Sequence, residues 1–213
     1  MMKFTTQKLI ATLMLAACLG GGLSACAPLI VGGAVVGSLM ATDRRTAGTQ
    51  VEDEGIELRA GSRLREQVGD RVHVNINSYN RQVLLTGEVP SAQDKQLVEQ
   101  VVARVENVRA IVNELAVSGN STLTQRSSDA LVTGKVKAGL VDAKGIYANA
   151  FKVLTERGTT YLMGRVTQRE ADRATDIARS TGGVLKVVRV LEIISEQELQ
   201  GMLPKPAAVE VKK

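Results

Sequence analysis

The chain has 213 residues, a net charge of +5 and 44% hydrophobic residues, so it is long enough for one large domain or two small ones. It contains two cysteines, one histidine and no tryptophan, and it carries neither a phosphate-binding loop nor a paired-glycine dinucleotide motif. This composition argues against an enzyme, and we expect no catalytic residue, no metal site and no dissociable cofactor. The lone His73 is interpreted as a surface or strand-edge residue.

The first 25 residues are predicted to form an export signal. Lys3 and Lys8 make a basic head, and the apolar run LIATLMLAACLGGG follows with the length of a signal-peptide hydrophobic region. A confident transmembrane helix needs about 20 apolar residues, more than this run provides. The next residues, Leu23-Ser24-Ala25-Cys26, resemble the bacterial lipobox. An ordinary cleaved signal with an incidental cysteine is the alternative.

The lipobox resemblance implies that Cys26 becomes the acylated N-terminus of the mature protein. It would carry a diacylglycerol and an N-acyl chain such as palmitate, and two or more chains hold a protein stably on a bilayer. Position 27 is Ala, not Asp, which implies sorting to the outer membrane with the protein facing the periplasm. Residues 26–45 are interpreted as a lipidated apolar tether. Because Cys18 would leave with the signal, the mature chain cannot form an internal disulfide.

Two segments align without a gap at an offset of 77 residues, one beginning at Val74 and the other at Phe151. Their sequences are VNINSYNRQVLLTGEVPSAQDK and FKVLTERGTTYLMGRVTQREAD. Each predicts a hairpin of two alternating strands with every second residue facing a core. Gly87 and Gly164 share one position in the second strand, where glycine indicates a bulge or a close backbone approach.

Helices are predicted on both sides of each hairpin. The patterns Ser91-x-x-Asp94 and Thr167-x-x-Glu170 are typical of helix starts, and a third strand follows each of these helices. Apolar residues four apart predict another helix ahead of each hairpin, and the two trios are Ile56, Ala60 and Leu64, then Val132, Val136 and Leu140. The acidic residues 52–54 are expected to open the first helix, where the dipole favours negative charge. The fold class is therefore α+β, with two tandem αββαβ copies that each pack two helices on a small three-stranded sheet.

This element order, the second-strand pattern V-x-L-x-G-x-V and the third strand VRAIVNELAV resemble the BON domain family. Residues 41–59, ATDRRTAGTQVEDEGIELR, resemble the segment that joins the lipid anchor to the first domain in dual-BON outer-membrane lipoproteins. The resemblance implies BON domains at residues 46–118 and 125–195, with a linker at 119–124 and a flexible tail at 196–213. It also implies phospholipid binding, support of envelope integrity, a place at division sites and no enzymatic activity.

The positive charge of the chain belongs to the second copy. Residues 50–118 carry 8 basic and 11 acidic side chains, a net charge of −3, whereas residues 119–195 carry 12 and 7, a net charge of +5. A basic surface suits nucleic acid or anionic lipid. Export and acylation exclude nucleic acid as a partner and supply the lipid. A solvated face without a partner is the alternative.

The helix predicted from about Ser128 to Ala143 carries the candidate binding site. With its apolar trio facing the core, a helical wheel places a second apolar strip on the opposite side, between basic residues. The candidate lipid-binding residues are Leu131, Gly134, Lys135, Lys137, Ala138, Val141 and Lys144. Such a strip suits the headgroup region of an anionic membrane, although Asp142 lowers the expected affinity. A contact between the two copies would use the strip equally well.

Two functions remain open from the sequence. In the first, a lipid-anchored module binds anionic phospholipid through its second domain and supports the outer-membrane barrier. In the second, the two domains form a non-enzymatic adaptor that binds envelope assembly proteins. The sequence predicts no particular oligomeric state.

Overall fold

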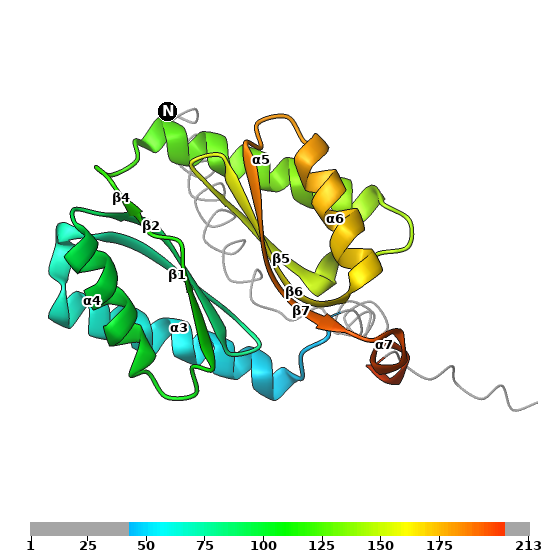
Figure 1. Cartoon of the computed structure of the whole chain (residues 1–213), viewed down its shortest axis with the longest axis horizontal. Helices are drawn as coiled ribbons and strands as arrows, with labels where there is room; N and C mark the ends of the chain where they lie inside the picture. The colour runs from blue at the N-terminus through cyan, green and yellow to red at the C-terminus, as the bar shows by residue number, and fades with distance from the viewer. Residues whose placement is uncertain (1–42, 203–213) are drawn as a thin grey trace, which may run out of the picture. The chain divides into compact units, whose positions relative to one another are not determined.

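A computed structural model describes residues 43–202, in which one arrangement of helices and strands occurs twice (Figure 1). Domain 1 consists of α3 (Ala47–Gln67), η2 (Gly69–Arg71), β1 (His73–Tyr79), β2 (Gln82–Val89), α4 (Ala92–Ala103), β3 (Ala110–Asn113) and β4 (Ala116–Val117). Domain 2 consists of α5 (Leu123–Asp142), η3 (Ala148–Ala150), β5 (Phe151–Glu156), β6 (Thr159–Thr167), α6 (Gln168–Ser180) and β7 (Lys186–Ile194), and α7 (Glu196–Met202) follows. The predicted αββαβ order is confirmed in both copies, except that the third strand of domain 1 is divided into β3 and β4, so that its sheet has four strands instead of three.

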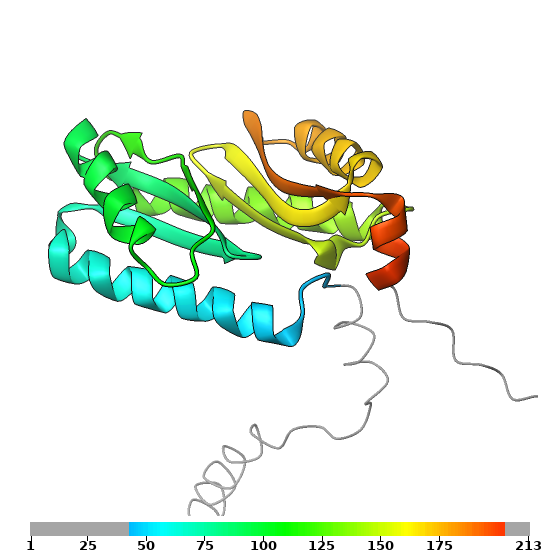
Figure 2. The same cartoon turned by 60° about the horizontal axis from the view of Figure 1, so that its bottom comes forward.

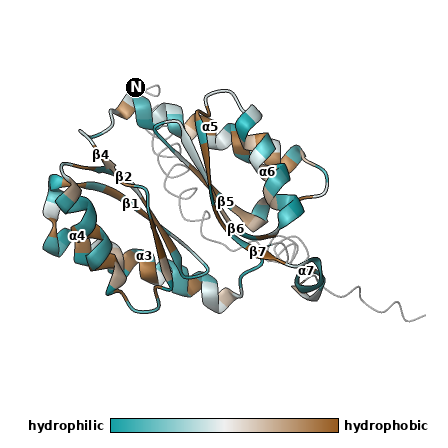
Figure 3. Ribbon diagram, in the orientation of Figure 1, coloured by the Kyte–Doolittle hydropathy of each residue, from teal (hydrophilic) through white to brown (hydrophobic). Residues whose placement is uncertain are grey.

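The second strand of each hairpin lies in the middle of its sheet. In domain 1, β2 pairs antiparallel with β1 and parallel with β3 and β4. In domain 2, β6 pairs antiparallel with β5 and parallel with β7. The parallel pairing requires a crossover, and α4 and α6 supply it. Figure 3 shows that the strands are largely hydrophobic, whereas α6 is largely hydrophilic.

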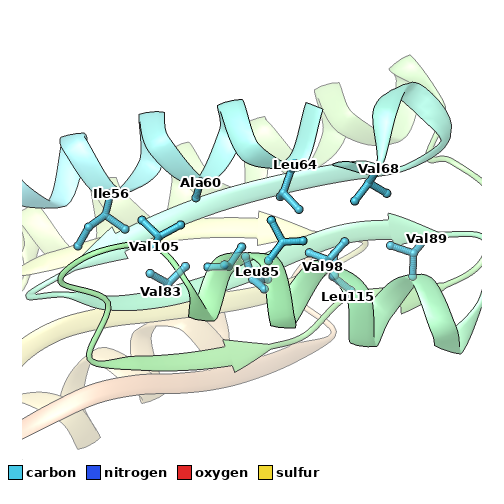
Figure 4. Close-up of a cluster of buried hydrophobic side chains, with 12 residues drawn as sticks. Ile56, Ala60, Leu64, Val68, Val83, Leu85, Val89, Val98, Val105 and Leu115 are labelled. Carbon is cyan, nitrogen blue, oxygen red and sulfur yellow. The ribbon is translucent and has the colours of Figure 1, made fainter. Parts of the chain in front are cut away.

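Each domain has its own core between one face of the sheet and two helices (Figures 1 and 2). Figure 4 shows Ile56, Ala60 and Leu64 of α3 directed toward strand and helix residues that include Val83, Leu85 and Val98. Val132, Val136 and Leu140 of α5 are buried in the same way in domain 2. Both predicted trios are therefore confirmed. Each large aliphatic side chain buried here contributes about 1.5–3 kcal/mol to folding.

The expectation that the acidic run at residues 52–54 opens the first helix is wrong. Helix α3 begins at Ala47, and the Thr46 hydroxyl accepts a hydrogen bond from the backbone N–H of Thr49. Asp53 lies further along the helix and is buried, and its carboxylate accepts hydrogen bonds from the backbone N–H groups of Asn80 and Arg81 at 2.8 and 2.7 Å. The acidic side chain thus holds the hairpin turn against the helix, a long-range role that the local charge pattern does not reveal.

The prediction of a close backbone approach at the two strand glycines is confirmed. A Cβ on Gly87 would collide with the carbonyl oxygen of His73, and a Cβ on Gly164 would collide with that of Ala150. Gly87 also has a φ of 111°, which L-residues rarely adopt. Any side chain at these positions would push apart the first two strands of the domain.

The faces of the two sheets that carry no helices share a third apolar cluster. Tyr79 and Leu84 of domain 1 lie with Tyr161, Met163 and Val190 of domain 2, and all five are at most 4% exposed. Burial raises the pKa of Tyr79 to about 12, and its hydroxyl donates to the Ala150 carbonyl at 3.4 Å. The two domains therefore bury apolar surface against each other in addition to their own cores.

This shared cluster changes what is expected of the separated domains. Fragments 46–118 and 122–196 should each unfold cooperatively, because each retains a complete core of its own. Each should unfold at lower denaturant concentration than the joined protein, since separation exposes the shared tyrosine, leucine and methionine side chains to water. Urea titrations followed by circular dichroism measure this difference. Equal midpoints for the fragments and the whole would show that the interface adds no stability.

The segment expected to be a flexible tail begins instead with helix α7. The Ser195 hydroxyl accepts a hydrogen bond from the Glu198 N–H at 3.1 Å, and the Glu198 carboxylate accepts one from the Ser195 N–H at 2.9 Å. Leu199 of this helix is only 4% exposed. The pattern Ser-x-x-Glu at 195–198 is a helix-start signal that could have been read from the sequence. Residues 203–213 lie outside the described part of the chain.

Candidate functional site

Helix α5, which carries the candidate strip, is fixed at its start and along its inner face. Thr122 and Gln125 form a reciprocal capping box, with the Gln125 N–H donating to the Thr122 hydroxyl at 3.2 Å. Asp129 is buried, and its carboxylate accepts hydrogen bonds from the backbone N–H groups of Arg157 and Gly158 at 2.7 and 2.9 Å. It thus repeats the role of Asp53, and the orientation of α5 on its sheet is defined.

The strip predicted on the outer side of α5 is exposed. Leu131 and Val141 are each 69% exposed, Gly134 and Ala138 are also exposed, and no atom lies within 4 Å of where a Gly134 side chain would begin. The alternative of a contact between the two domains is therefore wrong for this strip. The interdomain cluster uses strand residues on the opposite side of domain 2.

The structure adds two residues that the sequence interpretation missed. Helix α5 begins at Leu123, about five residues before the predicted start, so Leu123 and Ala130 extend the strip toward the start of the helix by about two turns beyond Leu131. Leu123 is 80% exposed and Ala130 is also exposed. The capping pattern Thr-x-x-Gln at 122–125 was the signal for the earlier start.

The lysines beside the strip are exposed and have no acidic partner. Lys135, Lys137 and Lys144 form no ion pair with any side chain among residues 43–202. Asp142 is the acidic residue on this side of the helix, and it is exposed. The outer face of α5 therefore combines apolar side chains with ammonium groups whose charge no neighbour neutralises. Figure 3 shows the corresponding alternation of hydrophobic and hydrophilic residues along α5.

The matching face of α3 differs in charge rather than in exposure. Leu58 is 74% exposed, as much as Leu131 on α5. Some charged groups of α3 are used internally, because Arg59 pairs with Glu52 at 2.6 Å. Glu57 likewise pairs with Lys152 of domain 2 at 2.7 Å. Arg65 of α3 is exposed and also forms no ion pair within residues 43–202, so the two helices differ in net charge: α3 carries three basic and five acidic side chains, whereas α5 carries three basic and two acidic ones.

Residues just ahead of α3 bind domain 2. The Arg44 guanidinium donates to both carboxylate oxygens of Glu170 at 2.6 and 2.7 Å and to the Arg165 carbonyl at 2.9 Å. The side chains of Arg44 and Glu170 are only 4% and 1% exposed. Burial alone would raise the pKa of the Glu170 carboxyl, but the hydrogen bonds from Arg44 and from the Thr167 N–H hold it below its ordinary value. This contact and the Arg45 contact described next are called the clasp.

The neighbouring Arg45 joins the same junction from the domain 1 side. It donates to Asp43 and to Asp53 at 2.8 Å, and its guanidinium lies 4.2 Å from the centre of the Tyr79 ring. Tyr79 belongs to the interdomain cluster. The clasp therefore connects the start of α3, the shared cluster and the first turn of α6.

His73 lies at the beginning of β1, as expected, but it is not without a partner. Its Nδ1 lies 2.9 Å from Oε2 of Glu88, which is buried on the neighbouring strand. Burial opposes ionisation of Glu88, yet the hydrogen bond from His73 lowers its pKa below the ordinary value. Arg157 of domain 2 lies 3.6 Å from the same carboxylate. The histidine thus forms part of a hydrogen-bonded group around Glu88, which also includes Ser121 of the interdomain linker.

Other predicted positions fall outside the described residues. Cys26 and most of the expected tether lie before residue 43, so the acylation site remains a prediction. Among residues 43–202, no helix is both long and apolar enough to cross a bilayer.

Comparisons with known proteins agree with this architecture. The BON domain profile matches residues 52–119 and 128–195. The outer membrane lipoprotein DolP of Haemophilus influenzae is 36% identical over 174 residues, which cover 81% of this chain and 90% of that protein. The 21 kDa hemolysin of Actinobacillus pleuropneumoniae is 33% identical over 154 residues, covering 71% of this chain and 79% of the relative.

A solved structure of CdsD, a structural protein of the Type III secretion system of Chlamydia trachomatis, aligns with 70% of this chain and 98% of its own. Its TM-score is 0.29 and its identity 14%, values too low to support an inference. The two BON matches and the extent of the similarity to DolP identify the family without this structure. The chain therefore belongs to the BON domain family, as a DolP-like outer-membrane lipoprotein with two BON domains.

Proposed function

We propose that the protein is anchored in the outer membrane by acyl chains on Cys26, faces the periplasm and binds anionic phospholipid through the outer face of α5. The observation that carries this proposal is the exposed apolar strip of α5 beside three lysines that have no acidic partner among residues 43–202. Apolar side chains at shallow depth and ammonium groups at the level of the phosphates match the two layers of an anionic membrane surface. Binding of this kind would support the outer-membrane barrier, including at division sites.

The clasp supports this proposal, because it connects the anchored end of the chain to domain 2. Arg44 is held at the first turn of α6 by Glu170. The preceding residue of that turn, Arg169, donates to the carbonyl of Gly145 at 2.8 Å, just beyond the end of α5. Segment and helix thus meet at one end of domain 2. A short connection to an anchored segment raises the effective concentration of the lipid surface, so weak binding by α5 is sufficient.

Vesicle flotation tests the proposal directly. The mature chain from residue 26 onward with Cys26→Ser should float with vesicles that contain phosphatidylglycerol and remain in solution with vesicles of phosphatidylcholine alone. The two samples differ only in the lipid headgroup, which has a net negative charge in phosphatidylglycerol and none in phosphatidylcholine. An adaptor for envelope assembly proteins would bind neither type of vesicle, and that result would favour the alternative function.

Acylation gives a second expected outcome. Cys26→Ser in the full precursor should fold normally but incorporate no labelled palmitate in cells, because a hydroxyl does not replace the thiol in the transfer. The matched control is Cys18→Ser, which lies within the expected signal and should leave incorporation unchanged. Radiolabel on the Cys26→Ser protein would show that the acyl group is attached elsewhere.

A further inference from the structure

The loop between α6 and β7, residues 181–185, presents a second apolar and basic surface on domain 2. Leu185 is 84% exposed, the highest value among the large hydrophobic side chains of residues 43–202. A cavity of about 360 Å³ lies beside it, lined by Arg179, Val184, Leu185, Lys186 and Val187. Arg179 and Lys186 are exposed and form no ion pair within residues 43–202.

The corresponding loop of domain 1 shows that this exposure is particular to domain 2. The Leu185 N–H donates to the Gly158 carbonyl at 2.8 Å, and the Arg109 N–H makes the same 2.8 Å bond to Arg81 in domain 1. Leu185 and Arg109 are therefore equivalent positions. Arg109 pairs with Glu192 of domain 2 at 2.9 Å, so its loop takes part in the interdomain contact. The loop of domain 2 has the apolar Leu185 in that place, which cannot form such an ion pair.

The loop also lies against the first half of α5. Gly183, with a φ of 102°, passes so close to the helix that a Cβ there would lie 2.6 Å from a methyl group of Val132. Val132 directly follows Leu131 of the strip. Leu185 packs over Gly158, and the Gly158 N–H donates to Asp129 of α5. The loop and the hairpin turn thus lie beside the first half of α5, whereas the clasp lies near the other end of that helix.

We propose that this loop is a second lipid-contact element, in which Leu185 enters the interface of an anionic membrane while Arg179 and Lys186 bind a lipid phosphate in the adjoining cavity. This proposal rests on the proposed function, since it enlarges the same binding surface. Its chemistry is that of the α5 strip, with an apolar group at shallow depth and cations at the level of the phosphates. Two separate contacts also fix the orientation of domain 2 on the bilayer. A single helix would leave the domain free to rotate about the helix axis.

Because the chain contains no tryptophan, the fluorescence of a single introduced tryptophan reports on one position only. Three single substitutions in the mature chain with Cys26→Ser give one reporter each, at Leu185→Trp in the loop, Leu131→Trp on α5 and Leu58→Trp on α3. With phosphatidylglycerol vesicles, the first two emission maxima should move to shorter wavelength and be quenched by brominated lipid, whereas Leu58→Trp should not change. Phosphatidylcholine vesicles and free inorganic phosphate should move none of them, which distinguishes a lipid surface from a soluble anion.

The possible outcomes separate the two proposals. A spectral shift of Leu131→Trp without one of Leu185→Trp would overturn the loop contact and leave the proposed function standing. If neither emission maximum shifts, the loop contact and the proposed function are both overturned. A second measurement avoids dependence on the reporter. Leu185→Ser should lower partitioning onto anionic vesicles about tenfold or more, because the insertion of the leucine side chain into the membrane interface is lost. Arg179→Glu with Lys186→Glu should lower it further, and unchanged partitioning in both folded variants would contradict the inference.

Discussion

Replacing Lys135 and Lys137 by glutamate should lower the partition coefficient of the protein onto anionic vesicles by about two orders of magnitude or more. Each basic residue near an anionic surface contributes about 1 kcal/mol, and a reversal replaces that attraction by repulsion. Both side chains are exposed and form no ion pair within the described part of the chain, so folding should be unaffected. Co-sedimentation with phosphatidylglycerol vesicles measures the partitioning, and circular dichroism checks the fold.

The apolar part of the surface has its own matched test. Leu131→Glu should weaken binding strongly, whereas Leu58→Glu on α3 should have a much smaller effect, although the two leucines are almost equally exposed, at 69% and 74%. Arg65→Glu on α3 should also have little effect. Salt should reproduce the lysine substitutions better than the leucine substitution, because the Debye length contracts to about 3 Å near 1 M. Equal losses from Leu131→Glu and Leu58→Glu would show that α5 has no special role.

The largest effect on stability is expected from Arg44→Ala. Removing one partner of a buried ion pair leaves an uncompensated charge and typically costs about 3–5 kcal/mol. Here Glu170 would lose two hydrogen bonds while remaining buried at the first turn of α6. Urea denaturation measures the change. Arg189→Ala is the control, because the Arg189–Asp172 pair has side chains that are 38% and 53% exposed and should contribute little.

The same pair predicts a dependence on pH. The pKa of Glu170 is lowered in the folded protein, so its contribution to stability is complete above the ordinary carboxyl value of 4.5. That contribution disappears as the pH falls through the lowered pKa. The difference in stability between the wild-type protein and Arg44→Ala should therefore shrink in acid. A constant difference down to pH 3 would contradict the assignment to this carboxylate.

The fold followed from the sequence because its signals are local and repeated. Strand alternation and helix-start patterns in each copy identified the hairpins and the second helices, and Ile56 and Val136 have the spacing that identifies an inner helix face. Exposure of Leu131 and Val141 followed from the same geometry, since residues opposite a buried face point away from the core. The start of α5 lies about five residues before the predicted one, because the capping pattern at Thr122 begins the helix.

Contacts between distant residues could not be predicted in the same way. Nothing near Arg44 in the sequence indicates that its partner is Glu170, because the contact depends on how the two domains meet. Tyr79 and Met163 alternate with core residues on their strands, which indicates a second face but not what covers it. The roles of Asp53 and Asp129 likewise depend on a hairpin turn 27 to 29 residues away. The interface and the clasp therefore required the structure.

The central claim is that the outer face of α5 meets anionic lipid, and a residue-by-residue measurement tests it most directly. Amide NMR spectra of the mature chain with Cys26→Ser would be recorded with bicelles that contain phosphatidylglycerol and a spin-labelled lipid. Signal loss should be greatest for residues 123–141, centred on Leu131 and Gly134, and α3 should retain its signals. Loss centred on α3, or none along α5 while the protein is bound, would contradict the assignment of the lipid-binding face.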